Sequence, residues 1–301
     1  MNAVEAAGLG KRFGSVWALR DCTLSIPSGR VAALVGPNGA GKTTLLHCIV
    51  GLCRPTAGSV TVIDALPAGS DDALDAVAFV AQQAPLLSHL RVGDTLDLAA
   101  VLNRSFDRRL AEERLAELAI PERRRVGRLS GGQQAQLALT VALARHPSLL
   151  VLDEPLSPLD PLARHELMAH LMVQVAEQGT SVVFSSHVVS ELERVADFLV
   201  VLGDGHVRVA GDVDELLAAH SHWCGPAAEV DGLSHVASVV HAELGSCQAR
   251  VLVRAEGGPP PGWDADAVGV EELVLGYLRT PSARAVPDSR ALQASPARGW
   301  A

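Results

Sequence analysis

The fold of this chain is decided by the stretch Gly36-Pro37-Asn38-Gly39-Ala40-Gly41-Lys42-Thr43, which has the pattern G-x-x-x-x-G-K-[ST]. In this pattern, successive backbone amides turn inward around a phosphate at the start of a helix, whose dipole favours anions. The glycines leave room for the tight backbone path and for the close approach of phosphate oxygens. Apolar residues 31–35 precede the stretch, and the mostly apolar residues 45–50 follow it. The sequence therefore predicts a phosphate-binding loop between a buried strand and a helix.

Lysine occurs at only two positions, Lys11 and Lys42, so almost all of the basic side chains are arginine. A chain so biased towards arginine has kept a compact ammonium group in the loop, where a planar guanidinium would fit badly. Lys42 can reach the β- and γ-phosphates of a nucleotide, and the Thr43 hydroxyl can bind Mg²⁺. The loop thus predicts a site for a nucleoside triphosphate and a magnesium ion.

A second motif, Asp153-Glu154-Pro155, follows the apolar residues 149–152. Four consecutive apolar residues are typical of a strand that is buried on both faces of a parallel sheet. Such a strand presents the residues after it at the sheet edge where ligands bind. We expect Asp153 to hold Mg²⁺ through a water molecule and Glu154 to polarise the attacking water.

A third motif, Leu129-Ser130-Gly131-Gly132-Gln133, begins a helix predicted over residues 131–145 and ended by His146 and Pro147. Its glycines make the start of this helix a second anion site. The domain that carries the loop has no use for a second set of backbone donors. We therefore predict that two copies of the chain close over nucleotide and that each completes the site of the other.

The three motifs resemble, in type and order, those of the ATP-binding subunit of an ABC transporter, over about residues 4–220. The resemblance implies that Gln82 senses Mg²⁺ or the attacking water and links the site to a membrane partner. The adjacent Gln83 is the alternative, but Gln82 has the better distance from the apolar residues 77–80. The resemblance also implies that His187, after residues 181–185, contacts the γ-phosphate.

Two further roles follow from the resemblance alone. Asp160 corresponds to a loop that crosses between the two protomers. Phe13 lies where the family places an aromatic ring on the adenine, and the nearby Trp17 is the alternative.

These motifs together predict an ATPase that uses ATP and Mg²⁺. The residues expected to act in catalysis are Glu154, His187 and Gln82. The residues expected to hold Mg²⁺ are Thr43, Gln82 and Asp153. The residues expected to bind ATP are Phe13, Gly36, Pro37, Asn38, Gly39, Ala40, Gly41, Lys42, Thr43, Thr44, Ser130, Gly131, Gly132, Gln133 and Asp160.

The resemblance implies an α/β fold, a P-loop NTPase of the ABC ATPase type with a RecA-like core, over residues 1–220. Residues 1–30 and 59–63 are expected to form an antiparallel β layer. Residues 93–103 and 107–118 have apolar side chains three or four apart, which predicts helices in a helical subdomain at about residues 83–146.

The motifs stop near residue 221, and we expect a small α/β appendage over residues 221–280. Within it, residues 236–240 and 249–253 are predicted strands and residues 270–279 a predicted helix. The Pro, Ser, Ala and Arg content of residues 281–301 predicts a disordered tail. The appendage loosely resembles those of drug-export and antibiotic-resistance ATPases of the ABC-2 type, which pair with a separate membrane subunit.

Three function classes remain open on these grounds. The first is an export ATPase that works with a separate transmembrane permease, and the second is an importer ATPase. The third is a non-transport ABC ATPase, but relatives of that kind carry two ATPase domains or a long coiled coil, which this sequence lacks. Export is the favoured prediction, and the sequence does not specify the substrate.

One departure from the family pattern lies just after the third motif. Relatives commonly carry basic residues there, whereas this chain has Gln134-Ala135-Gln136. Because the five motif residues are intact, we expect binding of the γ-phosphate to survive. The basic residues 123–125 and Arg128 precede the motif, and they belong either to a solvated loop or to a contact with the membrane partner.

Composition limits the partners and the location of this chain of 301 residues. A net charge of −9 argues against a nucleic-acid-binding surface. The apolar runs fall short of the about 18 residues that cross a bilayer, and residues 1–11 do not have the pattern of a signal peptide. We expect a cytoplasmic protein that lies on the inner face of the cell membrane through its permease.

The five cysteines are odd in number and include no C-x-x-C pair, which favours free thiols. His220, His222 and Cys224 are spaced so that an extended segment would bring their side chains together. A metal site is therefore conceivable at these residues, but a polar linker is the simpler interpretation.

Overall fold

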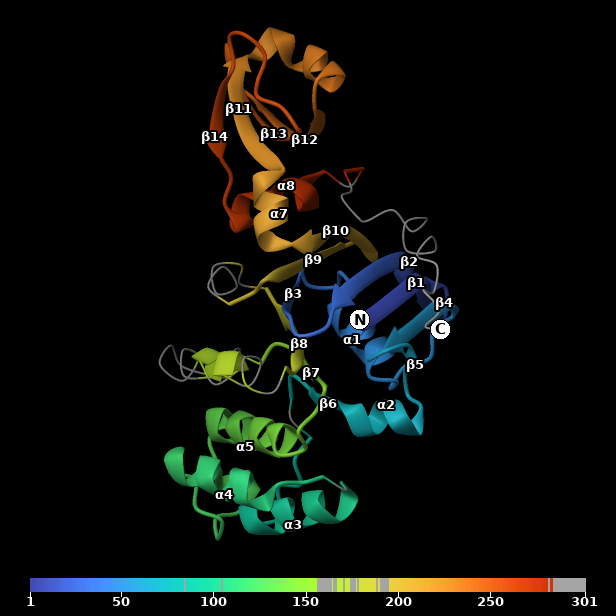
Figure 1. The fold of residues 1–301 in the computed structure, drawn as a ribbon, viewed down its shortest axis with the longest axis vertical. Helices are drawn as coiled ribbons and strands as arrows, with labels where there is room; N and C mark the ends of the chain where they lie inside the picture. Colours follow the sequence, from blue (N-terminus) through green and yellow to red (C-terminus); the bar gives the residue numbers. More distant parts are fainter. Residues whose placement is uncertain are drawn as a thin grey trace, which may run out of the picture.

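The computed structural model describes residues 1–83, 85–103, 105–155, 164, 167–169, 171–173, 177, 179–187, 189, 195–280 and 282–283. Asp160 lies outside the described residues, and so does the predicted tail apart from residues 282 and 283. Three β-sheets and a group of helices are arranged along one long axis (Figure 1).

The central sheet has six strands in the order β10-β9-β3-β8-β7-β6. Their bounds are β3 (Val31–Val35), β6 (Val77–Val80), β7 (Leu149–Leu152), β8 (Ser181–Ser186), β9 (Phe198–Gly203) and β10 (His206–Asp212). Strands β6, β7, β8, β3 and β9 run parallel to one another, and β10 pairs antiparallel with β9. Every residue of β3, β7, β8 and β9 is buried, as expected for apolar strands covered on both faces.

The predicted antiparallel layer is a second sheet in the order β2-β1-β4-β5. Its strands are β1 (Asn2–Phe13), β2 (Val16–Pro27), β4 (Ala57–Val62) and β5 (Leu66–Pro67). Helix α1 (Lys42–Ile49) shares a hydrophobic core with this sheet and with one face of the central sheet. This packing fixes the start of α1, and therefore the phosphate loop, at the junction of the two sheets. The short helix α2 (Asp71–Ala76) follows β5.

The helical subdomain contains α3 (Val92–Leu102), α4 (Arg108–Glu117), the 3₁₀ turn η1 (Val126–Arg128) and α5 (Gly131–Leu143). The side chain of Asp107 accepts a hydrogen bond from the backbone of Leu110 and so caps the start of α4. Leu96, Leu115 and Leu137 come from the three helices and pack in one core. The predicted helices are confirmed to within one residue for α3 and α4, whereas α5 ends two residues earlier than expected.

The residues after α7 (Val213–Ala218) form a third sheet in the order β12-β13-β11-β14. Its strands are β11 (His220–Pro226), β12 (Ser238–Leu244), β13 (Gln248–Arg254) and β14 (Asp264–Ala267). The 3₁₀ segment η3 (Ala227–His235) and Trp223, Val251 and Trp263 form a core at one face, and α8 (Val270–Arg279) lies at the other. Figure 1 shows this sheet at one end of the long axis and α3 to α5 at the other.

The interpretation of residues 220–224 as a polar linker is wrong, because they lie within β11. His220 is buried there and contacts the backbone oxygen of Leu216 through Nδ1 at 2.6 Å and the Tyr277 hydroxyl through Nε2 at 2.7 Å. These partners satisfy both ring nitrogens, and burial lowers the pKa of His220. Because both ring nitrogens have partners, His220 can be buried at the start of a strand. The sequence pattern did not predict this strand.

Among the described residues, no helix combines the length and the apolar character that spanning a membrane requires. The five cysteines are all free thiols. In the same part of the chain, no three side chains of His, Cys, Asp or Glu are grouped so that they could hold a metal ion on their own.

Candidate active site

The phosphate loop leaves the carboxyl end of β3 and enters α1, and two of its glycines are required by the space around them. A Cβ atom at Gly36 would lie 2.2 Å from the backbone oxygen of Leu202. Gly41 has a φ of +105°, and a Cβ atom there would lie 2.6 Å from the backbone oxygen of Ala18. Only glycine fits at these two positions without moving the neighbouring strand or turn.

Lys42 is the first residue of α1, and its side chain folds back over the loop. Its Nζ donates hydrogen bonds to the backbone oxygens of Gly36 at 2.7 Å and Pro37 at 3.3 Å. The residue is only 6% exposed, and this burial lowers its pKa, while the nearby Glu154 and Asp153 carboxylates oppose the shift. Lys42 therefore brings a poorly hydrated positive charge to the loop, where a phosphate group can pair with it.

Asp153 follows β7 at the same edge of the central sheet and is 3% exposed. Its Oδ1 accepts a hydrogen bond from the Ser185 hydroxyl at 2.6 Å. A buried carboxylate is stable only when it is paired or hydrogen-bonded, and here Ser185 and the nearby charge of Lys42 meet that need.

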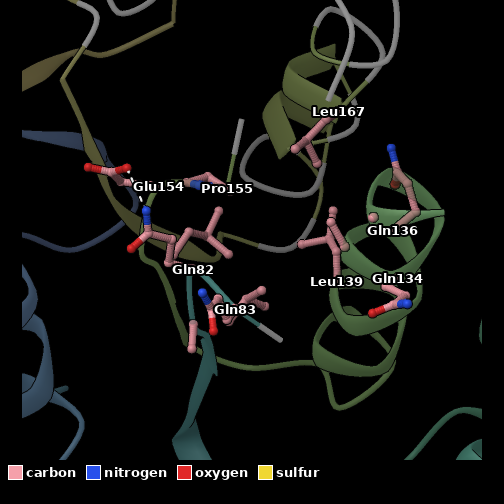
Figure 2. Close-up of a pocket in the computed structure, with 13 residues that line it drawn as sticks. Gln82, Gln83, Gln134, Gln136, Leu139, Glu154, Pro155 and Leu167 are labelled. Atoms are coloured by element: carbon pink, nitrogen blue, oxygen red, sulfur yellow. Dashed lines mark hydrogen bonds between the residues drawn. The ribbon is translucent and has the colours of Figure 1, made fainter. Parts of the chain in front are cut away.

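Glu154 turns away from the sheet, because its φ of +47° lies in the left-handed region that favours glycine. Gln82 Nε2 donates a hydrogen bond to Glu154 Oε2 at 3.0 Å, and His187 Nδ1 lies 3.5 Å from Glu154 Oε1. Three loops thus meet at one carboxylate. Figure 2 shows the amide of Gln82 directed at Glu154.

These side chains surround one cavity of about 470 Å³. Its lining consists of Ala18, Asn38, Gly39, Gly41, Lys42, Thr43, Thr44, Gln82, Glu154 and His187. Residues from the loop, from the end of β6 and from the ends of β7 and β8 therefore converge at this cavity. Asp153 does not line the cavity but is buried next to it, beside Glu154.

Gln82 and Gln83 lie differently with respect to the loop cavity. Gln82 lines the loop cavity, whereas Gln83 lines only a second cavity of about 420 Å³ between the sheet edge and α5. In Figure 2 the side chains of Gln134 and Leu139 on α5 lie across that second cavity from Gln82. Gln82 lines both cavities, and its role in joining the loop site to the helical subdomain stays a prediction.

The third motif lies at the start of α5, and its side chains cap the helix. The Ser130 Oγ accepts a hydrogen bond from the backbone of Gln133, and the Gln133 Oε1 accepts one from the backbone of Ser130, both at 3.2 Å. Ser130 and Gly131 are exposed, and a Cβ atom at Gly131 would meet nothing within 4 Å. Gly131 lines the second cavity, but Ser130 and residues 131–133 do not line the loop cavity.

The two candidate rings for adenine both lie on the β1–β2 hairpin and outside the lining of the loop cavity. Phe13 is 54% exposed, with Lys11 Nζ 5.1 Å from its ring centroid. Trp17 is less exposed, and the Arg12 guanidinium lies 5.6 Å from its ring centroid. Phe13 is therefore the more open surface for stacking, and its role stays a prediction.

The residues of the loop cavity fit a magnesium ion that binds together with a nucleotide. Mg²⁺ takes oxygen ligands and is usually held by one or two carboxylates plus substrate phosphates. Thr43, Gln82 and Asp153 offer a hydroxyl, an amide oxygen and a carboxylate. Substrate phosphates and water molecules are the other ligands that Mg²⁺ usually takes in such sites.

One residue of the site was missed at the level of sequence. Ser185 contacts both Asp153 and Glu154, yet the sequence singles it out only as the end of the segment that precedes His187. The signal was weak, because a single serine near a strand end is commonplace. Its position directly before Ser186 and His187 was the available clue.

Residues 19–157 match the protein family described as ABC transporter. The chain is 32% identical over 216 residues to an uncharacterised ABC transporter ATP-binding protein of Nostoc sp.. This alignment covers 69% of this chain and 64% of that protein. It is 35% identical over 222 residues to a sulfate/thiosulfate import ATP-binding protein of Mesorhizobium japonicum, covering 71% of this chain and 64% of that protein. The chain thus spans less than two thirds of the length of these relatives.

Solved structures extend the similarity to the fold. One is described as the ATP binding subunit of an ABC transporter, with a TM-score of 0.66 and 27% identity over 72% of this chain and 92% of that chain. A second is an ATP-binding cassette in a dimeric, post-hydrolysis state bound to ADP and Pi. It has a TM-score of 0.63 and 28% identity, and it covers 69% of this chain and 98% of that chain. These similarities confirm the predicted fold class, a P-loop NTPase of the ABC ATPase type.

Proposed function

We propose that this chain, whose matched cassette belongs to the ABC ATPases, is the ATP-hydrolysing subunit of a membrane transporter. One observation carries the proposal. Lys42, Thr43, Gln82, Glu154 and His187 come from separate segments and surround a single cavity at a phosphate loop. A cavity with this lining suits a triphosphate and an attacking water better than a small neutral ligand.

The roles of the side chains follow from where they lie. The amides of the loop and the ammonium of Lys42 bind the phosphates. When bound, Mg²⁺ would neutralise phosphate charge, and Thr43, Gln82 and Asp153 are the residues that would hold it. Glu154 accepts a hydrogen bond from the attacking water and polarises it, and Gln82 and His187 keep its carboxylate at the cavity.

Two copies of the chain are the proposed active form. The start of α5 exposes Ser130 and Gly131, and these residues do not line the loop cavity of their own chain. In a head-to-tail dimer, this helix start would cap the γ-phosphate that the other copy binds. ATP drives closure because its γ-phosphate makes contacts in the closed state that are absent from the open state. A dimer with bound ADP and Pi is described for the cassette to which this chain is similar.

A separate transmembrane permease is the second proposed partner, and it would hold the chain at the cytoplasmic face of the membrane. The helical subdomain and Gln82 are the proposed route by which closure reaches the permease. The names of several relatives support a transport role, among them import ATP-binding proteins for sulfate/thiosulfate, molybdenum and Fe(3+) ions.

The direction of transport is the point at which the comparisons and the sequence prediction differ. The named relatives are import ATPases, so they favour import over the export that we predicted. The prediction of export depended on a loose resemblance of the appendage to ABC-2 ATPases, and the comparisons lend it no support. Uptake and efflux measured in vesicles that contain the chain and its copurified permease would decide between the two directions.

The ATPase proposal is tested with the purified chain and its Glu154→Gln variant. We expect the wild type to hydrolyse ATP in the presence of Mg²⁺. The variant should bind ATP with unchanged affinity in calorimetry and should lose most of the hydrolysis, because an amide cannot polarise water as a carboxylate does. Hydrolysis at the wild-type rate in the variant would remove Glu154 from its role. Failure of the wild type to bind ATP would overturn the proposed function.

A further inference from the structure

Ser185 is a fully buried hydroxyl at the carboxyl end of a strand that is otherwise mostly apolar. It follows Val182, Val183 and Phe184 in β8 and is 0% exposed. A buried hydroxyl is costly unless it is hydrogen-bonded. Its partners therefore indicate why a polar atom lies at this point of the sheet.

Both partners of Ser185 belong to the catalytic edge of the neighbouring strand. Its hydroxyl donates to Asp153 Oδ1 at 2.6 Å and accepts a hydrogen bond from the backbone N–H of Glu154 at 2.8 Å. The parallel pairing of Leu152 with Phe184 sets this contact, because it places Ser185 level with Asp153. One oxygen atom therefore links the proposed magnesium ligand to the residue that polarises water.

The backbone N–H of Glu154 is the second group that Ser185 contacts, and it lies just past the end of β7. The N–H of Asp153 still donates to the backbone oxygen of Val80, as the last such bond between β7 and β6 at this edge. The N–H of Glu154 points to the opposite side, towards β8, as successive N–H groups of a strand do, and it donates to Ser185. The φ of +47° at Glu154 then turns the chain out of the strand. Ser185 accepts from the Glu154 N–H and so stabilises a backbone conformation that residues other than glycine rarely adopt.

We propose that Ser185 is a positioning residue for ATP hydrolysis. It holds the Glu154 backbone in its left-handed turn, which directs the carboxylate towards Gln82 and His187. It also fixes one oxygen of Asp153, a residue that would hold Mg²⁺. This inference rests on the proposed ATPase function. Ser185 does not line the loop cavity, so it acts through Asp153 and Glu154.

The test compares Ser185→Ala with Ser181→Ala. Ser181 is a matched control because its hydroxyl is also buried in β8 and accepts a hydrogen bond, from the backbone of Gly29 at 2.9 Å, but at the other end of the strand. We expect Ser185→Ala to lower kcat about 10- to 100-fold, the usual effect of removing a group that orients a ligand or a catalytic residue. The KM for ATP should change less than kcat, and Ser181→Ala should keep the wild-type kcat.

A binding measurement tests the positioning role of Ser185 independently of ATPase activity. In the Glu154→Gln background, calorimetry gives the affinity for ATP with Mg²⁺ and with EDTA. Adding Ser185→Ala should weaken binding of ATP with Mg²⁺ about 10-fold and leave binding in EDTA unchanged, because the loop and Lys42 are untouched. Ser185→Thr, which keeps the hydroxyl, should restore most of the kcat.

Several results would overturn the assignment while leaving the ATPase proposal intact. One is a wild type that hydrolyses ATP together with a Ser185→Ala variant whose kcat lies within twofold of it. Another is an equal loss of kcat in Ser181→Ala, which would indicate a general effect on the sheet. A folded Ser185→Thr variant as slow as Ser185→Ala would also count against the hydroxyl. If the wild type itself lacks ATPase activity, the proposed function fails instead.

Discussion

Two helix starts in this chain carry glycines, and they differ in how their backbone N–H groups are used. At the start of α1, Gly41 has a left-handed conformation, and no side chain caps the helix. At the start of α5, Ser130 and Gln133 cap each other's backbone N–H groups. The first start lines the loop cavity, whereas the second lies outside that cavity and exposes Ser130 and Gly131. In the proposed dimer, the first start holds a phosphate within its own chain and the second presents donors to the other copy.

The comparison is sharpest at Lys42, which has no equivalent at the start of α5. Lys42→Ala should weaken ATP binding about 10- to 100-fold, because a charged hydrogen-bond donor to phosphate contributes about 1.5–3 kcal/mol. Isothermal calorimetry with ATP in EDTA measures this without the contribution of hydrolysis. An affinity equal to that of the wild type would contradict the assignment of the loop.

The substitutions Gly36→Ala and Gly131→Ala add the same methyl group to the phosphate loop and to the start of α5. Gly36→Ala should destabilise the protein by about 1–3 kcal/mol, the usual cost of inserting a group into a packed site. The clash is with the backbone oxygen of Leu202, which cannot move aside as a flexible side chain could. The midpoint of thermal or urea unfolding reports the loss. An unfolding midpoint that does not change would mean that the loop has more room than the structure gives it.

Gly131→Ala should leave stability within about 0.5 kcal/mol of the wild type, as for surface substitutions in general, since open space surrounds this position. Its effect should appear only when a second copy approaches. Hydrolysis should then fall about 10-fold, because a methyl group keeps a phosphate from the helix start. ATP affinity of the single chain is the internal control and should stay constant. Full ATPase activity in this variant would show that α5 does not cap the nucleotide.

The caps of α5 and α4 provide the smallest expected effect. Ser130→Ala should cost about 1 kcal/mol of stability, the typical value for a lost N-cap. Asp107→Ala removes the comparable cap of α4 and should cost a similar amount. Only Ser130→Ala should also slow hydrolysis. If both variants hydrolyse ATP equally fast, Ser130 has a structural role alone.

Much of the fold was predictable from the sequence because it depends on patterns that recur along the chain. The buried strands are continuous apolar runs, and α3 and α4 have apolar residues at helical spacing. Strand β11 was missed because polar residues dominate its start, and His220 is accommodated there by Leu216 and Tyr277. Strand β14 was missed because all four of its residues are exposed and none is a large apolar residue.

The site, like the fold, has parts that could be predicted from the sequence and parts that could not. The loop and the acidic strand were predicted from the residues themselves, and the meeting of Gln82 and His187 at Glu154 was expected only through the resemblance. Neither the positive φ of Glu154 nor the bridging role of Ser185 is encoded in a local pattern. Both depend on the register between β7 and β8, which pairing across the sheet determines.

The central claim is that two copies of the chain trap ATP between the loop of one and the α5 start of the other. Sedimentation of the Glu154→Gln variant with ATP and Mg²⁺, alone and with the copurified permease, tests it most directly. We predict a dimer that forms with ATP, dissociates when ATP is replaced by ADP, and is lost when Gly131→Ala is added. A protein that stays monomeric with ATP under both conditions would contradict the claim.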